Sequence, residues 1–422
     1  MARIFIGVVM KINRPLYLNK LINKQANGLV KVITGIRRSG KSFLLDPLFK
    51  NYLLSQGVPE DHIIKIEFDR VENLKYHHDV EKLNAYIRSL IQDDSLYYLL
   101  LDEIQLVDQF EYLLTGLLYE KNVDIYVTGS NSKFLSSDII TEFRGRDDQV
   151  RVYPLSFSEF MSVFPGDKLD GWGEYVTYGG MPQLFSMKTD REKADYLRDL
   201  FDHTYFKDIV DRYKIKRTDV LESLVNILAS SVGSLTNPRK IYRTFQSHGE
   251  KELSINTIYS YLSFLEEAFV VEKSERYDVK GRKYVQTPNK YYFTDVGLRN
   301  ACLNFRQQEE SHLMENIIYN ELVVRGYNVD VGLVEIREDD KRKQTEVDFV
   351  CNQGSKRYYI QSALHLDTRD KTIQESRSLD HINDNFKKII IVKDVLKPWR
   401  TETGILVLGV FDFLLSQGSL DF

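Results

Sequence analysis

One short segment, GIRRSGKS at residues 35–42, constrains this chain more than any other. It matches the pattern G-x-x-x-x-G-K-[ST], follows a β-branched run and precedes the helix-type pattern Phe43-Leu44-Leu45. Glycines at both ends let successive backbone N–H groups turn inward around a polyphosphate. The pattern therefore predicts a nucleoside triphosphate-binding loop formed by Gly35, Ile36, Arg37, Arg38, Ser39, Gly40, Lys41 and Ser42. In such a loop Lys41 reaches the β- and γ-phosphates, and the Ser42 hydroxyl binds Mg²⁺.

A second element bears on hydrolysis. The apolar run at residues 96–101 ends in two adjacent carboxylates, Asp102 and Glu103. A continuously apolar strand is what a parallel sheet covered on both faces requires. At the end of such a strand Asp102 would bind Mg²⁺, directly or through water, and Glu103 would polarise the attacking water. Taken alone, the segment also fits an ordinary strand followed by a polar turn.

Strand and helix patterns alternate over residues 1–155. Five strands with crossover helices predict an α/β fold with a parallel, doubly wound sheet, and ligands bind at the carboxyl ends of such strands. The expected strands are Val30–Thr34, Ile63–Phe68, Tyr97–Asp102, Ile125–Thr128 and Gln149–Tyr153, and helical patterns include Val80–Gln92 and Gln109–Glu120.

Length and composition limit the number of domains and the classes of protein to which the chain can belong. A length of 422 residues predicts two to four domains, and a net charge of −4 excludes a polycation that coats nucleic acid while allowing a local basic face. The two cysteines, Cys302 and Cys351, lack metal-ligand spacing and are expected to be core residues. No apolar stretch reaches the roughly 18 residues of a membrane span, and Ile4–Met10 lacks a cleavage site. A cytoplasmic protein is expected.

Several motifs together resemble a known family. GIRRSGKS, LDEIQ, TGSNS, FRGR, YPLSFSEF and YGGMP occur in this order. They are similar to those of prokaryotic AAA+ ATPases that carry a C-terminal domain of unknown function with a nuclease-like end. The resemblance covers nearly the whole chain. It implies a P-loop AAA+ core at residues 1–155, a small helical lid at residues 156–217, and two further domains.

The same resemblance implies roles for polar residues beyond the loop. Ser130 or Asn131 takes the sensor position beside the γ-phosphate, with a simple polar turn as the alternative. Arg144 and Arg146 are candidates for an arginine finger that acts across a subunit interface, which implies a homo-oligomer. The alternative for these arginines is a solvated pair at a helix end.

Residues 218–305 show three helical patterns followed by a hairpin with a basic tip. This order predicts a winged helix, a fold that commonly contacts double-stranded DNA. Its candidate phosphate contacts are Lys280, Arg282, Lys283 and Lys290. Winged helices also serve as packing or interaction modules, and this alternative stays open.

Residues 306–422 form another α/β pattern. A helical Glu315, a strand Asp348 and a third strand resemble the PD-(D/E)xK nuclease fold, whose carboxylates bind Mg²⁺. In the third strand Gln361 replaces the acid and Ala363 replaces the lysine. An alanine cannot stabilise developing negative charge or orient water, so we expect a degenerate nuclease site.

These observations predict a Mg²⁺-dependent ATPase with ATP and Mg²⁺ as cofactors, in which ATP turnover drives or switches contact with DNA through the winged helix. A signalling or scaffold ATPase that acts on a protein partner is the runner-up. An ATP-dependent nuclease ranks lowest.

Overall fold

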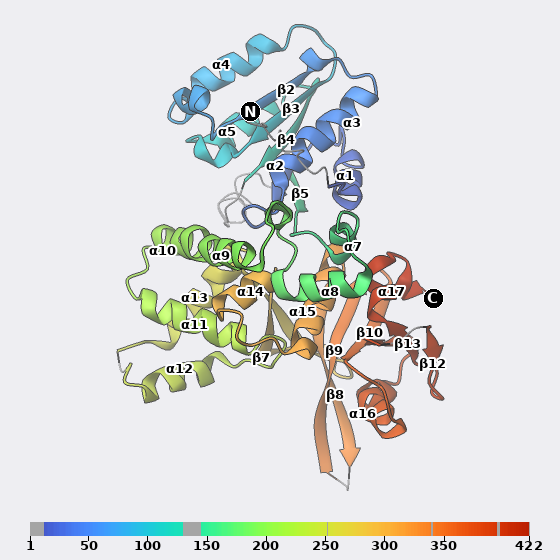
Figure 1. Cartoon of the computed structure of the whole chain (residues 1–422). Coiled ribbons are helices and arrows are strands. Elements are labelled where there is room, and N and C mark those ends of the chain that lie inside the picture. The colour runs from blue at the N-terminus through green and yellow to red at the C-terminus, as the bar shows by residue number, and fades with distance from the viewer. Residues whose placement is uncertain (1–11, 130–144, 251, 339–340, 395–396, 422) are drawn as a thin grey trace, which may run out of the picture. The chain divides into compact units, whose positions relative to one another are not determined.

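The computed structural model describes residues 12–129, 145–250, 252–338, 341–394 and 397–421 (Figure 1). The chain forms two compact units, Met1–Pro154 and Leu155–Phe422. Within the described residues, no helix is both long enough and apolar enough to cross a membrane.

The first unit contains a five-stranded sheet in the order β2-β3-β4-β1-β5, and every neighbouring pair is parallel. All residues of β1 and β3 are buried, as strands covered on both faces require. The strands are β1 (Val30–Thr34), β2 (Ile63–Glu67), β3 (Tyr97–Asp102), β4 (Val123–Thr128) and β5 (Asp147–Arg151). The predicted parallel α/β core is confirmed.

Helices pack against both faces of this sheet. Side chains alternate across a strand, so Tyr126 of β4 faces away from its neighbours Ile125 and Val127. Tyr126 packs against Phe49 with ring centroids 4.5 Å apart, whereas Ile125 and Val127 share a core cluster with Leu83 and other residues of α4 and α5. The helices of this unit are α1 (Pro15–Ile22), α2 (Lys41–Phe43), which continues through a π-helical turn (Leu44–Phe49) into α3 (Lys50–Ser55), α4 (Val80–Leu90) and α5 (Phe110–Leu117).

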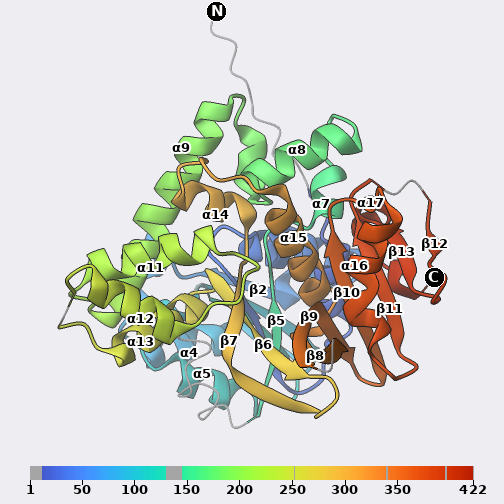
Figure 2. The ribbon, with the colours of Figure 1, turned by 90° about the horizontal axis from the view of Figure 1, so that it is seen from below.

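The second unit begins with a helical region, and further helices follow among its strands. The helices of the whole unit are α7 (Phe157–Met161), α8 (Lys168–Tyr178), α9 (Asp190–Leu200), α10 (Lys207–Tyr213), α11 (Thr218–Ser230), α12 (Pro238–Ser247), α13 (Ile255–Glu267), α14 (Val296–Cys302), α15 (Glu310–Val324), α16 (Arg369–Asp380) and α17 (Val410–Leu415). Figure 2 shows α11, α12 and α13 gathered beside the hairpin of residues 271–293, with α16 and α17 at the opposite end of the sheet in this unit.

A mixed eight-stranded sheet organises this unit in the order β12-β13-β11-β10-β9-β8-β6-β7. Its strands are β6 (Val271–Asp278), β7 (Lys283–Phe293), β8 (Asn328–Glu338), β9 (Lys341–Gln353), β10 (Lys356–Ala363), β11 (Lys387–Val392), β12 (Trp399–Arg400) and β13 (Leu406–Gly409). The β6–β7 hairpin joins the sheet because β6 pairs in parallel with β8. The sheet therefore continues across the domain boundary expected between residues 305 and 306.

The YGGMP segment joins two helices of the second unit. The N–H of Gly180 donates to Oδ2 of Asp295 at 2.7 Å, and Asp295 also caps α14 by accepting from the N–H of Leu298. Burial raises the pKa of Asp295 to about 6, against the lowering effect of these N–H groups. A side chain at Gly179, where φ is +75°, would collide with the Asp295 carboxylate. Glycine at residue 179 thus lets the end of α8 approach the start of α14.

Candidate nucleotide-binding site and a buried polar cluster

The loop at residues 35–42 leaves the carboxyl end of β1 in a conformation that needs glycine. Gly35 has φ of +135° and Gly40 has φ of +96°, both in the region that disfavours side chains. A Cβ atom at residue 35 would collide with the backbone oxygen of Val152. Glycine is therefore required at residue 35 both by its own dihedral angle and by the chain that passes beside it.

Lys41 lies inside this loop. Its ammonium donates to the backbone oxygens of Gly35 at 2.9 Å and Ile36 at 3.1 Å, and the residue is 4% exposed. Burial lowers the pKa of Lys41 to about 8, although the carboxylates of Glu103 and Asp102 act in the opposite direction. The cation is thus enclosed by the loop that is expected to surround phosphate.

Ser42 and Asp102 bring the two predicted motifs together. The Ser42 hydroxyl donates to Oδ1 of Asp102 at 3.1 Å. Thr128, the last residue of β4, donates to the same carboxylate oxygen. Burial raises the pKa of Asp102, while the hydrogen bonds from Thr128 and Ser42 oppose this rise. The carboxyl ends of β3 and β4 therefore meet the loop after β1 at one edge of the sheet.

Glu103 follows directly in a strained backbone conformation. Its φ of +55° is uncommon for a residue with a side chain, and such strain is concentrated at functional sites. The N–H of Glu103 donates to the Thr128 hydroxyl at 3.0 Å, and its carboxylate accepts from the Gln105 amide. Thr128 thus positions both acidic residues.

The side chains present fit ATP and Mg²⁺. The Ser39 hydroxyl is buried in the loop and has no hydrogen-bond partner among the residues that the structure describes, so it is available to a phosphate oxygen. A hydroxyl and a carboxylate, from Ser42 and Asp102, are oxygen ligands of the type Mg²⁺ takes together with phosphates and water. Within the described ranges, no group of three or more His, Cys, Asp or Glu residues could hold a metal alone.

Two positioning residues escaped the sequence analysis. Arg14 is buried and donates to the backbone oxygens of Ser39 at 2.7 Å and Tyr153 at 2.8 Å, which ties the loop to the chain after β5. No motif in the sequence marks Arg14. Thr128 could have been found, since it ends a predicted strand and only Gly129 separates it from the expected sensor residues.

The remaining site residues predicted for the first unit differ in their exposure, and some lie outside the described residues. Arg37 is half-buried and Arg38 is exposed. Ser130, Asn131 and Arg144 lie outside the described residues. Arg146 is exposed, stacks 5.9 Å from the Tyr119 ring centroid, and precedes β5 at the amino end of the sheet.

Comparison with known proteins fits this geometry. A family described as "AAA domain" matches residues 27–161, and a "Domain of unknown function" matches residues 169–309. An uncharacterized protein of Haemophilus influenzae is 34% identical over 96% of this chain and 98% of its own length. An uncharacterized protein of Methanocaldococcus jannaschii is 27% identical over 85% and 79%. The chain belongs to the AAA ATPase family.

A solved Walker-type ATPase of Pyrococcus abyssi is also similar to this AAA protein. It has a TM-score of 0.44 and 14% sequence identity, and covers 69% of this chain and 96% of its own.

The second unit of this AAA protein contains a buried polar cluster. The ammonium of Lys290, on β7, lies 2.8 Å from Glu315 of α15, 3.0 Å from Asp348 of β9 and 3.2 Å from Glu346 of β9. Tyr292 donates to the same Glu315 oxygen at 2.7 Å. Burial alone would lower the pKa of Lys290, but the three carboxylates together raise it well above its usual range.

This cluster corrects one expectation. Lys290 was expected to contact DNA phosphates, but it is 1% exposed and paired with three carboxylates, so it cannot present its charge at the surface. Lys280, Arg282 and Lys283 are exposed at the β6–β7 turn.

The nuclease-like residues gather around the same lysine. Asp348 accepts from the N–H of Ser362 at 2.9 Å, and its own N–H donates to the Gln361 side chain at 3.3 Å. Ala363 is buried in the apolar core that includes Val347. Among the described residues, the ammonium group that lies at the nuclease-like carboxylates Glu315 and Asp348 is therefore that of Lys290.

Proposed function

We propose that this AAA protein binds ATP with Mg²⁺ at residues 35–42 and hydrolyses it. The observation that carries the proposal is the 3.1 Å hydrogen bond between Ser42 and Asp102, because it joins the phosphate loop to the acidic strand end. Lys41 exchanges its backbone acceptors, Gly35 and Ile36, for phosphate oxygens. Bound Mg²⁺ supplies charge neutralisation at the phosphates.

Glu103 acts as the general base in this proposal. Its carboxylate lies one residue beyond Asp102, at the strand end nearest the loop, and orients a water molecule for attack on the terminal phosphate. Thr128 supports this role because one hydroxyl binds both the Asp102 side chain and the Glu103 N–H.

Arg146 is proposed to complete the site of a neighbouring copy. It precedes β5, where Asp147 pairs with Val30 at the start of β1, whereas the loop begins after the end of β1. Five strand residues at about 3.3 Å each separate the two ends by roughly 17 Å. This separation exceeds the reach of an arginine side chain, so Arg146 is suited to act across an interface and not on its own loop.

We propose further that α11, α12, α13 and the β6–β7 hairpin form a winged helix that binds duplex DNA. Helix α12 exposes Arg239, Lys240 and Arg243 and contains no acidic residue. The outer face of α13 carries uncharged polar side chains, including Asn256 and Ser260. A basic helix, α12, beside the neutral polar helix α13 suits phosphate contact next to a base-reading surface.

Two measurements test the proposed ATPase activity and the proposed DNA binding. Phosphate release from ATP is measured with Mg²⁺ for wild type and Lys41→Ala, and duplex DNA binding is measured across a salt series. We expect turnover that the substitution removes, together with DNA affinity that falls as salt rises. ATP turnover without any DNA binding at low salt would support the proposed ATPase activity and contradict the proposed DNA binding.

A further inference from the structure

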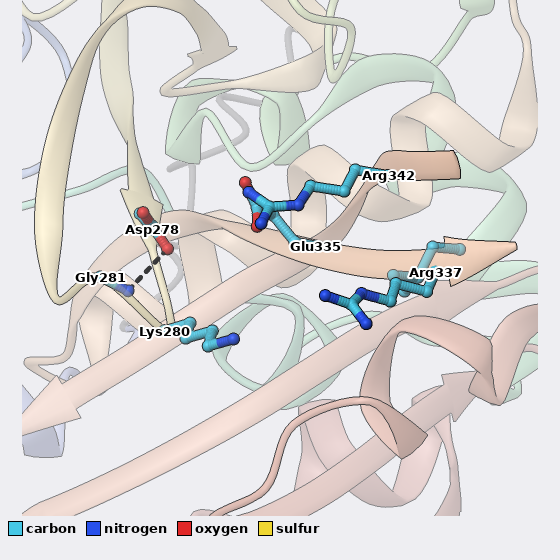
Figure 3. A pocket seen from close by; sticks show the side chains of 7 residues that line it. Asp278, Lys280, Gly281, Glu335, Arg337 and Arg342 are labelled. Carbon is cyan, nitrogen blue, oxygen red and sulfur yellow. Dashed lines mark hydrogen bonds between the residues drawn. The ribbon is translucent and has the colours of Figure 1, made fainter. Parts of the chain in front are cut away.

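The β6–β7 and β8–β9 hairpins meet along their outer ends. Asp278 of β6 pairs with Leu333 of β8, and the N–H of Val279 donates to the Leu333 oxygen at 3.1 Å. This register places the β6–β7 turn beside the outer part of β8. The two hairpins enclose a hollow of about 420 Å³ lined by Asp278, Lys280, Gly281, Glu335, Ile336, Arg337 and Arg342 (Figure 3).

Cations from both hairpins face this hollow. The charged ends of Lys280 and Arg337, which come from different hairpins, point toward each other (Figure 3). Arg342 is the direct cross-strand partner of Arg337. Like charges directly opposite on an antiparallel ladder are destabilising, so this arrangement costs the sheet stability unless an anion lies between them.

Two acidic side chains, Asp278 and Glu335, also line the hollow, and Asp278 has a structural role in the β6–β7 turn. Asp278 accepts from the N–H of Gly281 at 2.8 Å and so fixes the β6–β7 turn. Glu335 of β8 is exposed and also lines the hollow. The surrounding turn and strand add the exposed cations Arg282, Lys283, Lys341 and Lys343. Among the side chains that the structure describes at this edge, basic groups therefore outnumber acidic ones. In sequence, the three residues between Arg337 and Lys341 are acidic (Glu338, Asp339 and Asp340), and the whole chain carries a net charge of −4.

We infer that the two hairpin ends together bind backbone phosphates of duplex DNA, with Lys280, Arg337 and Arg342 as the contacting groups. This inference rests on the proposed DNA-binding function and adds to it a second hairpin from outside the winged helix. The β8–β9 hairpin projects from the rest of its unit, so it can follow the backbone of a duplex (Figure 1). Guanidinium groups suit this task because they bind phosphate through two hydrogen bonds.

The test compares full-length variants for binding to a fluorescent DNA duplex between about 50 and 200 mM salt. Arg337→Ser/Arg342→Ser should weaken binding ~10-fold or more and reduce the slope of log affinity against log salt by about 2, since two phosphate contacts are lost. Lys280→Gln on the other hairpin should reduce the slope by about 1. The matched control is Arg191→Ser/Arg198→Ser on α9, which removes two arginines paired with Asp195 and should leave the slope unchanged.

The outcomes separate the inference from the function on which it rests. Wild-type DNA binding that the double variant retains would overturn the inference and leave the DNA partner in place. Absence of wild-type DNA binding would overturn both the inference and the proposed DNA-binding function. Poly-glutamate is an anionic polymer without phosphate, and a protein that binds it but not DNA would overturn both as well. The melting temperature of the double variant guards against misfolding: removal of a like-charge pair should not lower it, whereas a purely structural role for these arginines would.

Discussion

The ammonium of Lys290 lies 2.8 Å from Oε1 of Glu315, although the two residues belong to different elements, strand β7 and helix α15. Asp348 and Glu346 of β9 approach the same nitrogen. One buried cation therefore links the proposed wing to the nuclease-like part of the sheet.

Lys290→Met should strongly destabilise the protein. Removing the cation leaves buried carboxylates without a partner, which costs about 3–5 kcal/mol of unfolding free energy. Denaturant unfolding measures this loss. Lys283→Met, at the exposed start of the same strand, is the control and should change stability by no more than about 0.5 kcal/mol. Equal stability of the two variants would show that Lys290 does not neutralise the cluster.

The nuclease-like end should not cleave DNA. Lys290 already occupies the carboxylates, and Ala363 offers no charge where the nuclease motif has a lysine. Plasmid and single-stranded DNA, incubated with Mg²⁺ or Mn²⁺, should be cut no faster by wild type than by Asp348→Ala. Cleavage that the substitution abolishes would contradict the prediction that this site is inactive.

ATP affinity should depend on pH through Lys41. Its pKa of about 8 without nucleotide rises when phosphate surrounds the ammonium, so the charge contribution is complete below pH 8 and declines as pH rises above it. The dissociation constant should increase up to about tenfold per pH unit above pH 8. Isothermal titration calorimetry of the wild-type protein with ATP between about pH 7 and pH 10 tests this. A wild-type affinity that is flat across this range contradicts the role of Lys41.

Arg146 should act in trans. Arg146→Ala and Glu103→Gln chains, each nearly inactive alone, should regain turnover when mixed, since some interfaces then pair an intact nucleotide site with an intact arginine. The loss from the arginine alone is expected to be ~10³-fold. Lys121→Ala, another exposed cation at the amino end of the sheet, should keep its activity. If the mixture of folded chains does not regain ATP turnover, Arg146 does not act across an interface.

Local patterns were enough to predict the first unit. The loop at residues 35–42 and the strand ending at Asp102 are each one continuous segment, so residue spacing alone is enough to predict them. The strand bounds of β1 and β3 agree with the prediction because continuous apolar runs bounded by polar residues leave little choice.

Long-range pairing determined what the sequence did not reveal. Lys290 resembles the neighbouring basic residues of the hairpin in sequence, and only the pairing of β6 with β8 brings it toward Glu315 and Asp348. Arg14 likewise contacts Ser39 across 25 residues without any local signal. Charge patterns in a hairpin therefore predict exposure poorly when the hairpin joins a larger sheet.

The rate of ATP hydrolysis by Glu103→Gln tests the central claim most directly. The substitution keeps size and hydrogen bonding but removes the carboxylate, so the variant should bind ATP with wild-type affinity and turn it over at least ~10²-fold more slowly. Phosphate release by Glu103→Gln at the wild-type rate, with Mg²⁺ and saturating ATP, would contradict the assignment of the catalytic base and of the site built around it.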